Sequence, residues 1–224
     1  MLASIAPAVD RLVVNDNSGL SRSDNLAKVE RSPFAGGNRL HVIQTHFVDF
    51  GQMRNDALAP LHREPTPPDW VMFIDADEVH GDQLSYVARA VLPRLHATVG
   101  QLDAYVLSLL GTFSWYTDIG RRVFFYRYAR ELRWTNSVHE KLAGVRGSTV
   151  VIPYVYPHYG GVVGAERYAA KYARYRDLED GVGAASQPPA WERLFAEKAP
   201  EVRPYRAPHP PAVQSTLQTI ARER

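Results

Sequence analysis

The pattern of apolar and polar positions divides the chain into short strands and helices separated by turn-forming residues. Apolar or β-branched runs predict strands at residues 12–14, 40–45, 71–74, 104–110, 123–128 and 150–156. Apolar positions at helical spacing predict helices at 51–62, 83–95 and 165–178, and shorter helical stretches at 1–9 and 21–30. The proline-rich segment 64–69 and the aromatic segment 111–120 are predicted to be loops.

The order of these elements predicts an α/β protein. In about the first hundred residues strands alternate with helices, a pattern typical of a mostly parallel sheet flanked by helices. The later strands are joined by shorter loops, so we expect a small antiparallel addition to that sheet. Residues 182–224 are rich in proline and have little periodicity, and we expect a loosely ordered tail after a single domain at 1–181.

Composition narrows the classes of function only modestly. The 224 residues carry a net charge of +2, which is too small to indicate a nucleic-acid-binding protein. The absence of cysteine excludes disulfides and thiolate chemistry. The sequence has no apolar run long enough to span a bilayer and no pattern of a signal peptide, so we expect a cytoplasmic protein.

The segment 69–80, DWVMFIDADEVH, is the strongest chemical signal in the chain. An apolar run leads directly into three acids, Asp75, Asp77 and Glu78, which places the two aspartates where a buried strand ends. Carboxylates in such a loop can hold Mg²⁺ or Mn²⁺ while leaving other ligand positions to water and phosphate oxygens. The alternative is that these acids have no functional role and form a solvated, capped strand end.

The same segment also fits the signature of haloacid-dehalogenase-like phosphohydrolases. In that interpretation Asp75 is the nucleophile and Asp77 the general acid. Such an enzyme should begin its fold with this strand, whereas two predicted strands precede it here. It should also have an acidic pair at the end of a later apolar strand, but the acids at 179–180 end a predicted helix. The phosphohydrolase is therefore the weaker hypothesis.

Five segments in order resemble family 2 glycosyltransferases, which have the GT-A fold. They are VDRLVVNDNS at 9–18, GQMRNDAL at 51–58, DWVMFIDADE at 69–78, LRWTNSVHE at 132–140, and PHYG at 157–160 followed by KYARYRDL at 171–178. Each motif alone is only moderately specific, but their order makes the set specific. The resemblance covers about residues 3–181 and implies a GT-A-like α/β domain.

The resemblance assigns roles to residues of two segments. Asp77 would ligate Mg²⁺ or Mn²⁺ bound to the donor's diphosphate, and Asp75 would contact the ribose, a metal-bound water or the metal itself. Glu140 would be the general base that takes the proton of the acceptor hydroxyl, and His139 would orient Glu140 or contact phosphate. The alternative for Glu140 is a salt bridge with Lys141 or an arginine.

Four further residues complete the candidate site. His158 would be a metal ligand, and an imidazole beside carboxylates favours Mn²⁺ over Mg²⁺; the alternative is a buried, hydrogen-bonded histidine. Arg54 and Asn55 start a predicted helix and could meet the nucleotide. Asp16 ends a strand at the same edge and is also a nucleotide candidate, although aspartate is common in such turns.

The resemblance implies a metal-dependent enzyme that moves a sugar from a nucleoside diphosphate sugar to an acceptor hydroxyl, with inversion. The acceptor would be a cell-envelope glycan or its lipid-linked precursor, with peripheral contact at the inner face of the membrane. The sequence departs from the family in lacking the first strand, which the family places between the strands at 12–14 and 71–74. The alternative outside the enzymes is a degenerate binding module, which would bind carbohydrate or nucleotide but catalyse no reaction.

Overall fold

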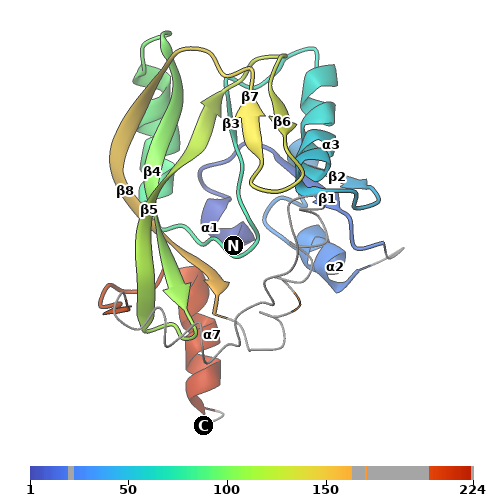
Figure 1. Ribbon diagram of the computed structural model, residues 1–224. Helices are drawn as coiled ribbons and strands as arrows, with labels where there is room; N and C mark the ends of the chain where they lie inside the picture. Colours follow the sequence, from blue (N-terminus) through green and yellow to red (C-terminus); the bar gives the residue numbers. More distant parts are fainter. Residues whose placement is uncertain (20–22, 163–169, 171–201, 223–224) are drawn as a thin grey trace, which may run out of the picture.

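The computed structural model describes residues 1–19, 23–162, 170 and 202–222, and it is an α/β protein in which strands predominate (Figure 1). The described helices are α1 (Leu2–Ile5), α2 (Asp24–Glu30), α3 (Phe50–Arg63), α4 (Gln83–Tyr86) and α7 (Pro211–Arg222). A π-helical turn (Val87–Val91) and a 3-10 turn (Leu92–Arg94) continue α4, and another 3-10 turn (Gly37–Arg39) precedes β2. The strands are β1 (Leu12–Asp16), β2 (Leu40–Gln44), β3 (Trp70–Met72), β4 (Val99–Leu110), β5 (Trp115–Arg127), β6 (Arg133–Thr135), β7 (Lys141–Ala143), β8 (Ser148–Gly161) and β9 (Arg203–Pro204).

The largest sheet is mixed, which corrects the expectation of a mostly parallel sheet. Its order is β3-β5-β4-β8, and β9 pairs with β5. Only β4 and β8 are parallel in it, while β5 is antiparallel to β3, β4 and β9. The short connection between β4 and β5 permits only an antiparallel pair. Gly111 starts that connection with φ of 68°, a left-handed conformation that suits glycine.

Two smaller sheets lie beside the main one. β1 and β2 form a parallel pair, with Leu12 opposite Leu40 and Asp16 opposite Gln44. β6 and β7 form an antiparallel hairpin. Among the described residues no strand joins β1 to β3, so these two strands are the ends of separate sheets.

The main core lies between one face of the large sheet and the helices α1 and α4. Its fully buried side chains include Leu84, Leu102, Phe124 and Tyr156. A second apolar cluster contains Leu58, Val71, Tyr126 and Leu132. Because Leu58 is on α3 and Val71 is on β3, this second cluster fixes α3 against the start of the loop that carries Asp75.

The element boundaries differ from the sequence predictions mainly at the long strands. The strands β4, β5 and β8 all extend beyond their predicted limits, and β5 includes residues 115–120, which we expected to be a loop. β3 ends at Met72, before the predicted limit of 74. The predicted helix at 165–178 lies outside the described residues. In the tail that we expected to be loosely ordered, the described residues form β9 and α7.

Candidate functional site

The loop after β3 is held in place by its own backbone and by β8. The backbone N–H of Glu78 donates to the carbonyl of Asp75 (3.0 Å), and the Asp75 N–H donates to Oε2 of Glu78 (3.2 Å). The Tyr159 N–H donates to the carbonyl of Asp77 (2.8 Å), and the Val79 N–H donates to the carbonyl of Pro157 (3.4 Å). This bridge fixes the acidic loop beside the end of β8.

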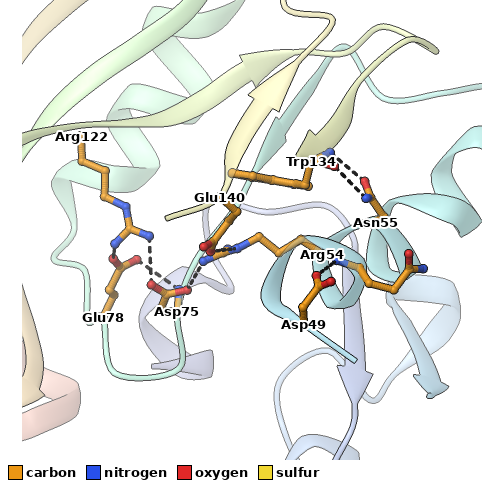
Figure 2. Close-up of polar contacts among 9 residues, drawn as sticks. Asp49, Arg54, Asn55, Asp75, Glu78, Arg122, Trp134 and Glu140 are labelled. Atoms are coloured by element: carbon orange, nitrogen blue, oxygen red, sulfur yellow. Dashed lines mark hydrogen bonds and ion pairs between the residues drawn. The ribbon is translucent and has the colours of Figure 1, made fainter. Parts of the chain in front are cut away.

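Two arginines and three carboxylates alternate in a continuous chain of ion pairs, which we call the carboxylate–arginine chain (Figure 2). Arg54 donates from Nε to Oε1 of Glu140 (2.6 Å) and from Nη2 to Oδ1 of Asp75 (2.9 Å). Arg122 donates from Nη2 to Oδ2 of Asp75 (2.9 Å) and from Nη1 to Oε1 of Glu78. Both oxygens of Asp75 therefore accept from a guanidinium.

The first turn of α3 places Arg54. Asp49 caps the helix by accepting the Gln52 N–H (2.7 Å), which satisfies one of the N–H groups left unpaired at a helix start. The Phe50 N–H donates to the carbonyl of Ser137 (3.1 Å). Gly51 lies so close to the backbone carbonyl of Asn136 that an added Cβ would collide with it. The helix start and residues 136–137 are therefore in direct backbone contact.

The side chain of Asn55 attaches the β6–β7 hairpin to α3. Its Nδ2 donates to the Trp134 carbonyl (2.9 Å), and its Oδ1 accepts the Trp134 N–H (2.7 Å). The guanidinium carbon of Arg54 lies 5.0 Å from the centre of the Trp134 ring, within cation–π range. Figure 2 shows the ring lying along the Arg54 side chain. Because Asn55 is used in this way, it positions the hairpin that carries Glu140.

Burial and charge set opposite pKa shifts on the two acids next to Arg122. Burial alone raises the pKa of Asp75, but the guanidiniums of Arg54 and Arg122 more than offset this and hold it below its usual range. Burial raises the pKa of Glu78 to about 7, because the Arg122 charge offsets less of the burial and the Asp75 charge adds to it. Of these two acids, Asp75 is therefore the one that stays ionised.

Asp77 points out of this chain and meets His158. Its Oδ1 lies 3.1 Å from Nε2 of His158. The hydrogen bond to Asp77 raises the pKa of His158, against the effect of burial. A Cβ on Gly160 would lie 2.5 Å from Oδ2 of Asp77 and 2.7 Å from the imidazole, so glycine leaves room around this pair. The Asp77 side chain is 40% exposed and that of His158 is 23% exposed.

No group of three or more His, Cys, Asp and Glu side chains is arranged for a metal ion within the described ranges. A pair of protein ligands is still enough for Mg²⁺ or Mn²⁺ bound to a phosphate-containing substrate, because these ions retain water and phosphate ligands. A carboxylate oxygen beside an imidazole nitrogen, with space left by Gly160, fits such an ion. Asp75 fits it less well, since both of its oxygens already accept from arginines.

Asp16 lies at the end of β1 and holds local structure together. It accepts hydrogen bonds from the Ser18 N–H (3.3 Å), the Ser23 hydroxyl (3.1 Å) and the Gln44 amide (3.4 Å). These bonds connect β1 to the start of α2 and the end of β2. Asp16 also lines the cavity that Arg54 and Asp75 line, so its expected nucleotide contact remains a prediction.

His139 has a φ of 52°, a left-handed conformation that is uncommon for a residue with a side chain. It follows Asn136, which has a φ of 69°, in the loop between β6 and β7. These two backbone conformations belong to the turn that presents Glu140 to Arg54. The expected role of His139 in orienting Glu140 or contacting phosphate remains a prediction.

Arg122 and Trp134 belong to the site but were not among the candidate site residues chosen from the sequence. Arg122 belongs to a basic run along β5, in which its neighbour Arg121 pairs with Asp103 instead (2.7 Å). Alternation along a strand sends neighbouring side chains to opposite faces, and this separates the two arginines. Arg127 also has a structural role, because its guanidinium stacks over Trp70.

Neither known protein families nor curated proteins provide a relative of this chain. No model of a known protein family matches it, and no curated protein matches it. None of the helices in the described part of the chain has both the length and the apolar character to cross a membrane.

Proposed function

We propose that this chain is a metal-dependent glycosyltransferase with a GT-A-like domain, which moves a sugar from a nucleoside diphosphate sugar to an acceptor hydroxyl with inversion. The observation that supports it best is the pairing of Asp77 with His158 at the end of β3, next to the chain that holds Glu140. The candidate metal ligands are Asp77 and His158, and the candidate base is Glu140. They are connected because Asp75, in the same loop as Asp77, is in the carboxylate–arginine chain with Glu140. The acceptor would be a cell-envelope glycan or its lipid-linked precursor.

Asp77 and His158 would hold the Mn²⁺ or Mg²⁺ ion. When bound, the ion would neutralise charge on the leaving diphosphate. His158 ligates as a neutral imidazole, so binding must displace the proton that Asp77 favours on it. Affinity for Mn²⁺ should therefore rise with pH, through the range in which His158 loses its proton.

The residues on the other side of the loop would organise the substrates. Asp75 would meet the donor through its ribose or a water of the metal, and Asp16 and Arg54 line the same cavity and would meet the nucleotide. Glu140 would take the proton from the acceptor hydroxyl. Arg54 donates to Oε1 of Glu140, which fixes the orientation of the carboxylate.

The experiment is a thermal-shift series with Mn²⁺ alone and Mn²⁺ with UDP, GDP and other nucleoside diphosphates. The proposal expects stabilisation by one nucleotide that requires Mn²⁺ and that is lost in Asp77→Asn. The matched control is Asp118→Asn, which changes an exposed aspartate of β5. Sugar transfer should then be lost in Glu140→Gln while nucleotide binding is retained. Equal stabilisation of the wild type and Asp77→Asn would contradict the metal assignment.

Two other functions give different results in the same assays. A binding module without catalysis would bind nucleotide or glycan but show no transfer, and Glu140→Gln would change nothing. A haloacid-dehalogenase-like phosphohydrolase would release phosphate in a reaction abolished by Asp75→Asn. This second alternative is less well supported, because each oxygen of Asp75 already accepts from an arginine.

A further inference from the structure

The end of β8 lies beside the acidic loop, and its last large side chain is that of Tyr159. The Tyr159 N–H donates to the carbonyl of Asp77 (2.8 Å), and the preceding residue, His158, forms a β-bridge with Glu78. Only two glycines follow Tyr159 in the strand, so it is the last residue of β8 that has a side chain. A contact that fixes this side chain therefore also fixes the backbone that joins His158 to the acidic loop.

A part of the chain that is distant in sequence makes such a contact. The Tyr159 hydroxyl oxygen lies 2.9 Å from Nδ1 of His209, which follows 50 residues later. The ring of Phe113, from the connection between β4 and β5, lies 5.8 Å from that of Tyr159 and edge-on to that of His209 at 6.0 Å. Tyr159, His209 and Phe113 thus form one aromatic group from three separate parts of the chain.

The segment 202–210, which carries His209, is itself attached to the main sheet. It contains β9, which pairs with the start of β5. The Tyr205 N–H donates to the carbonyl of Ser114 (2.8 Å), and the ring of Tyr205 lies 4.7 Å from that of His209. α7 begins just after His209, near the end of β8 (Figure 1). His209 is therefore anchored to the sheet independently of its contact with Tyr159.

The imidazole of His209 has two polar partners. It faces the Tyr159 hydroxyl and is hydrogen-bonded to the backbone of Phe113. A neutral imidazole has one donor and one acceptor nitrogen, which is enough for both partners. Burial lowers the pKa of His209, although the bond to Phe113 acts in the opposite direction. The hydrogen bond between His209 and Tyr159 is thus one that a neutral imidazole can form.

We propose that His209 is a positioning residue, which acts through Tyr159 to hold the acidic loop against the end of β8. The contacts are continuous: His209 bonds to the side chain of Tyr159, and the backbone of Tyr159 bonds to the carbonyl of Asp77. This arrangement brings Oδ1 of Asp77 to 3.1 Å from Nε2 of His158. The geometry of that pair would thus depend on a segment outside the five that resemble glycosyltransferases.

The consequence for metal binding rests on the proposed function, in which Asp77 and His158 hold the ion. Two protein ligands make few bonds to an ion, so its affinity depends strongly on their being held at the correct separation beforehand. Losing the bond between Tyr159 and His209 removes one net hydrogen bond from that restraint, which changes an equilibrium constant by about fivefold. Coupling between two sites is reciprocal, so bound Mn²⁺ should in turn stabilise the attachment of the segment 202–210.

The test compares the full chain with Tyr159→Phe, with His209→Leu and with the double variant. Hydrogen exchange of the Tyr159 amide is measured without metal, and affinity for Mn²⁺ alone is measured by titration calorimetry. Each single variant should exchange this amide at least about fivefold faster and bind Mn²⁺ at least about fivefold more weakly. The double variant should be no weaker than His209→Leu, because the bond is already lost in that single variant.

Two further variants separate positioning from a general loss of packing. His209→Asn keeps a side chain that can accept the Tyr159 O–H, and it should bind Mn²⁺ within about twofold of the wild type. Tyr205→Phe keeps a ring against His209 and removes a hydroxyl that donates instead to the Pro208 carbonyl (3.3 Å), so it should leave Mn²⁺ affinity unchanged. The amides of β1, which belongs to a separate sheet, should exchange at the wild-type rate in every variant.

The outcomes distinguish the role of His209 from the proposed sugar transfer. Unchanged exchange of the Tyr159 amide in His209→Leu would overturn the positioning role, and so would equal acceleration at Tyr159 and in β1. Wild-type affinity for Mn²⁺ in His209→Leu would also overturn it. A wild type that binds no Mn²⁺ would instead overturn the metal site of the proposed function, and exchange of the Tyr159 amide would then decide by itself whether His209 holds the loop.

Discussion

His80 is buried among aromatic rings and should make the protein sensitive to mild acid. Its side chain is 2% exposed, and its ring lies 4.5 Å from that of Tyr156 and stacks on Tyr154. Its Nδ1 lies 2.7 Å from the Tyr154 hydroxyl oxygen. Burial lowers the pKa of His80 to about 3, and the positive charge of the amino terminus adds to this effect.

The size of the effect follows from linkage between protonation and folding. Unfolded His80 has its ordinary pKa of 6.5, so at pH 5 the unfolded chain gains a proton there and the folded chain does not. Above pH 6.5 His80 is neutral in both the folded and the unfolded state, so it causes no pH dependence there. As the pH falls from 6.5 towards 3, only the unfolded state takes up the proton, and the free energy of unfolding decreases. At 1.36 kcal/mol per pH unit, the loss between pH 7.5 and pH 5 is about 2 kcal/mol.

The assay is urea unfolding at pH 7.5 and pH 5 of the wild type and of His80→Phe, which keeps an aromatic ring in the cluster. The difference in free energy of unfolding between the two proteins should shift by about 2 kcal/mol in favour of His80→Phe at the lower pH. His46→Asn, at an exposed histidine, should follow the wild type. Parallel pH dependence of wild type and His80→Phe would refute the argument.

Two further predictions concern the carboxylate–arginine chain. Arg54→Leu should lower the free energy of unfolding by about 3 kcal/mol, because it leaves the carboxylate of Glu140, which is 15% exposed, without its cation. The double variant Arg54→Leu/Glu140→Leu should recover at least about 1 kcal/mol of this loss. A double variant that is less stable than Arg54→Leu would contradict the argument. Glu78 has a pKa raised to about 7 from 4.5, so its ionisation opposes folding increasingly as pH rises through that interval. Glu78→Gln should therefore gain about 3 kcal/mol relative to the wild type between pH 4.5 and pH 7.5 in urea unfolding, and an unchanged difference would refute the pKa assignment.

The local elements were predictable where apolar spacing and turn residues agree. The predicted helix at 51–62 corresponds to α3, and the predicted strands at 12–14 and 40–45 correspond to β1 and β2. The extension of β5 over residues 115–120 was not predictable from the pattern, because that part of the strand is largely exposed and its polar residues resemble a loop. Strand partners also stayed hidden, since pairing depends on contacts distant in sequence.

The sequence predicted the residues of the candidate site better than the ion pairs and hydrogen bonds between them. The sequence nominated Asp77 and His158 together, and the structure places them 3.1 Å apart. It left open whether Glu140 forms a salt bridge, and the structure pairs it with Arg54. The role of Arg122 depends on which face of β5 it occupies, which a run of basic residues does not reveal.

The close approach of Gly51 to Asn136 has a consequence for motion. With no side chain between the two backbones, and with the Phe50 N–H bonded to the Ser137 carbonyl, the first turn of α3 and the β6–β7 loop cannot slide past one another. Any opening of the loop to admit a large molecule must carry the helix start along as one rigid body. The distance between Arg54 and Glu140 would then stay constant during such an opening.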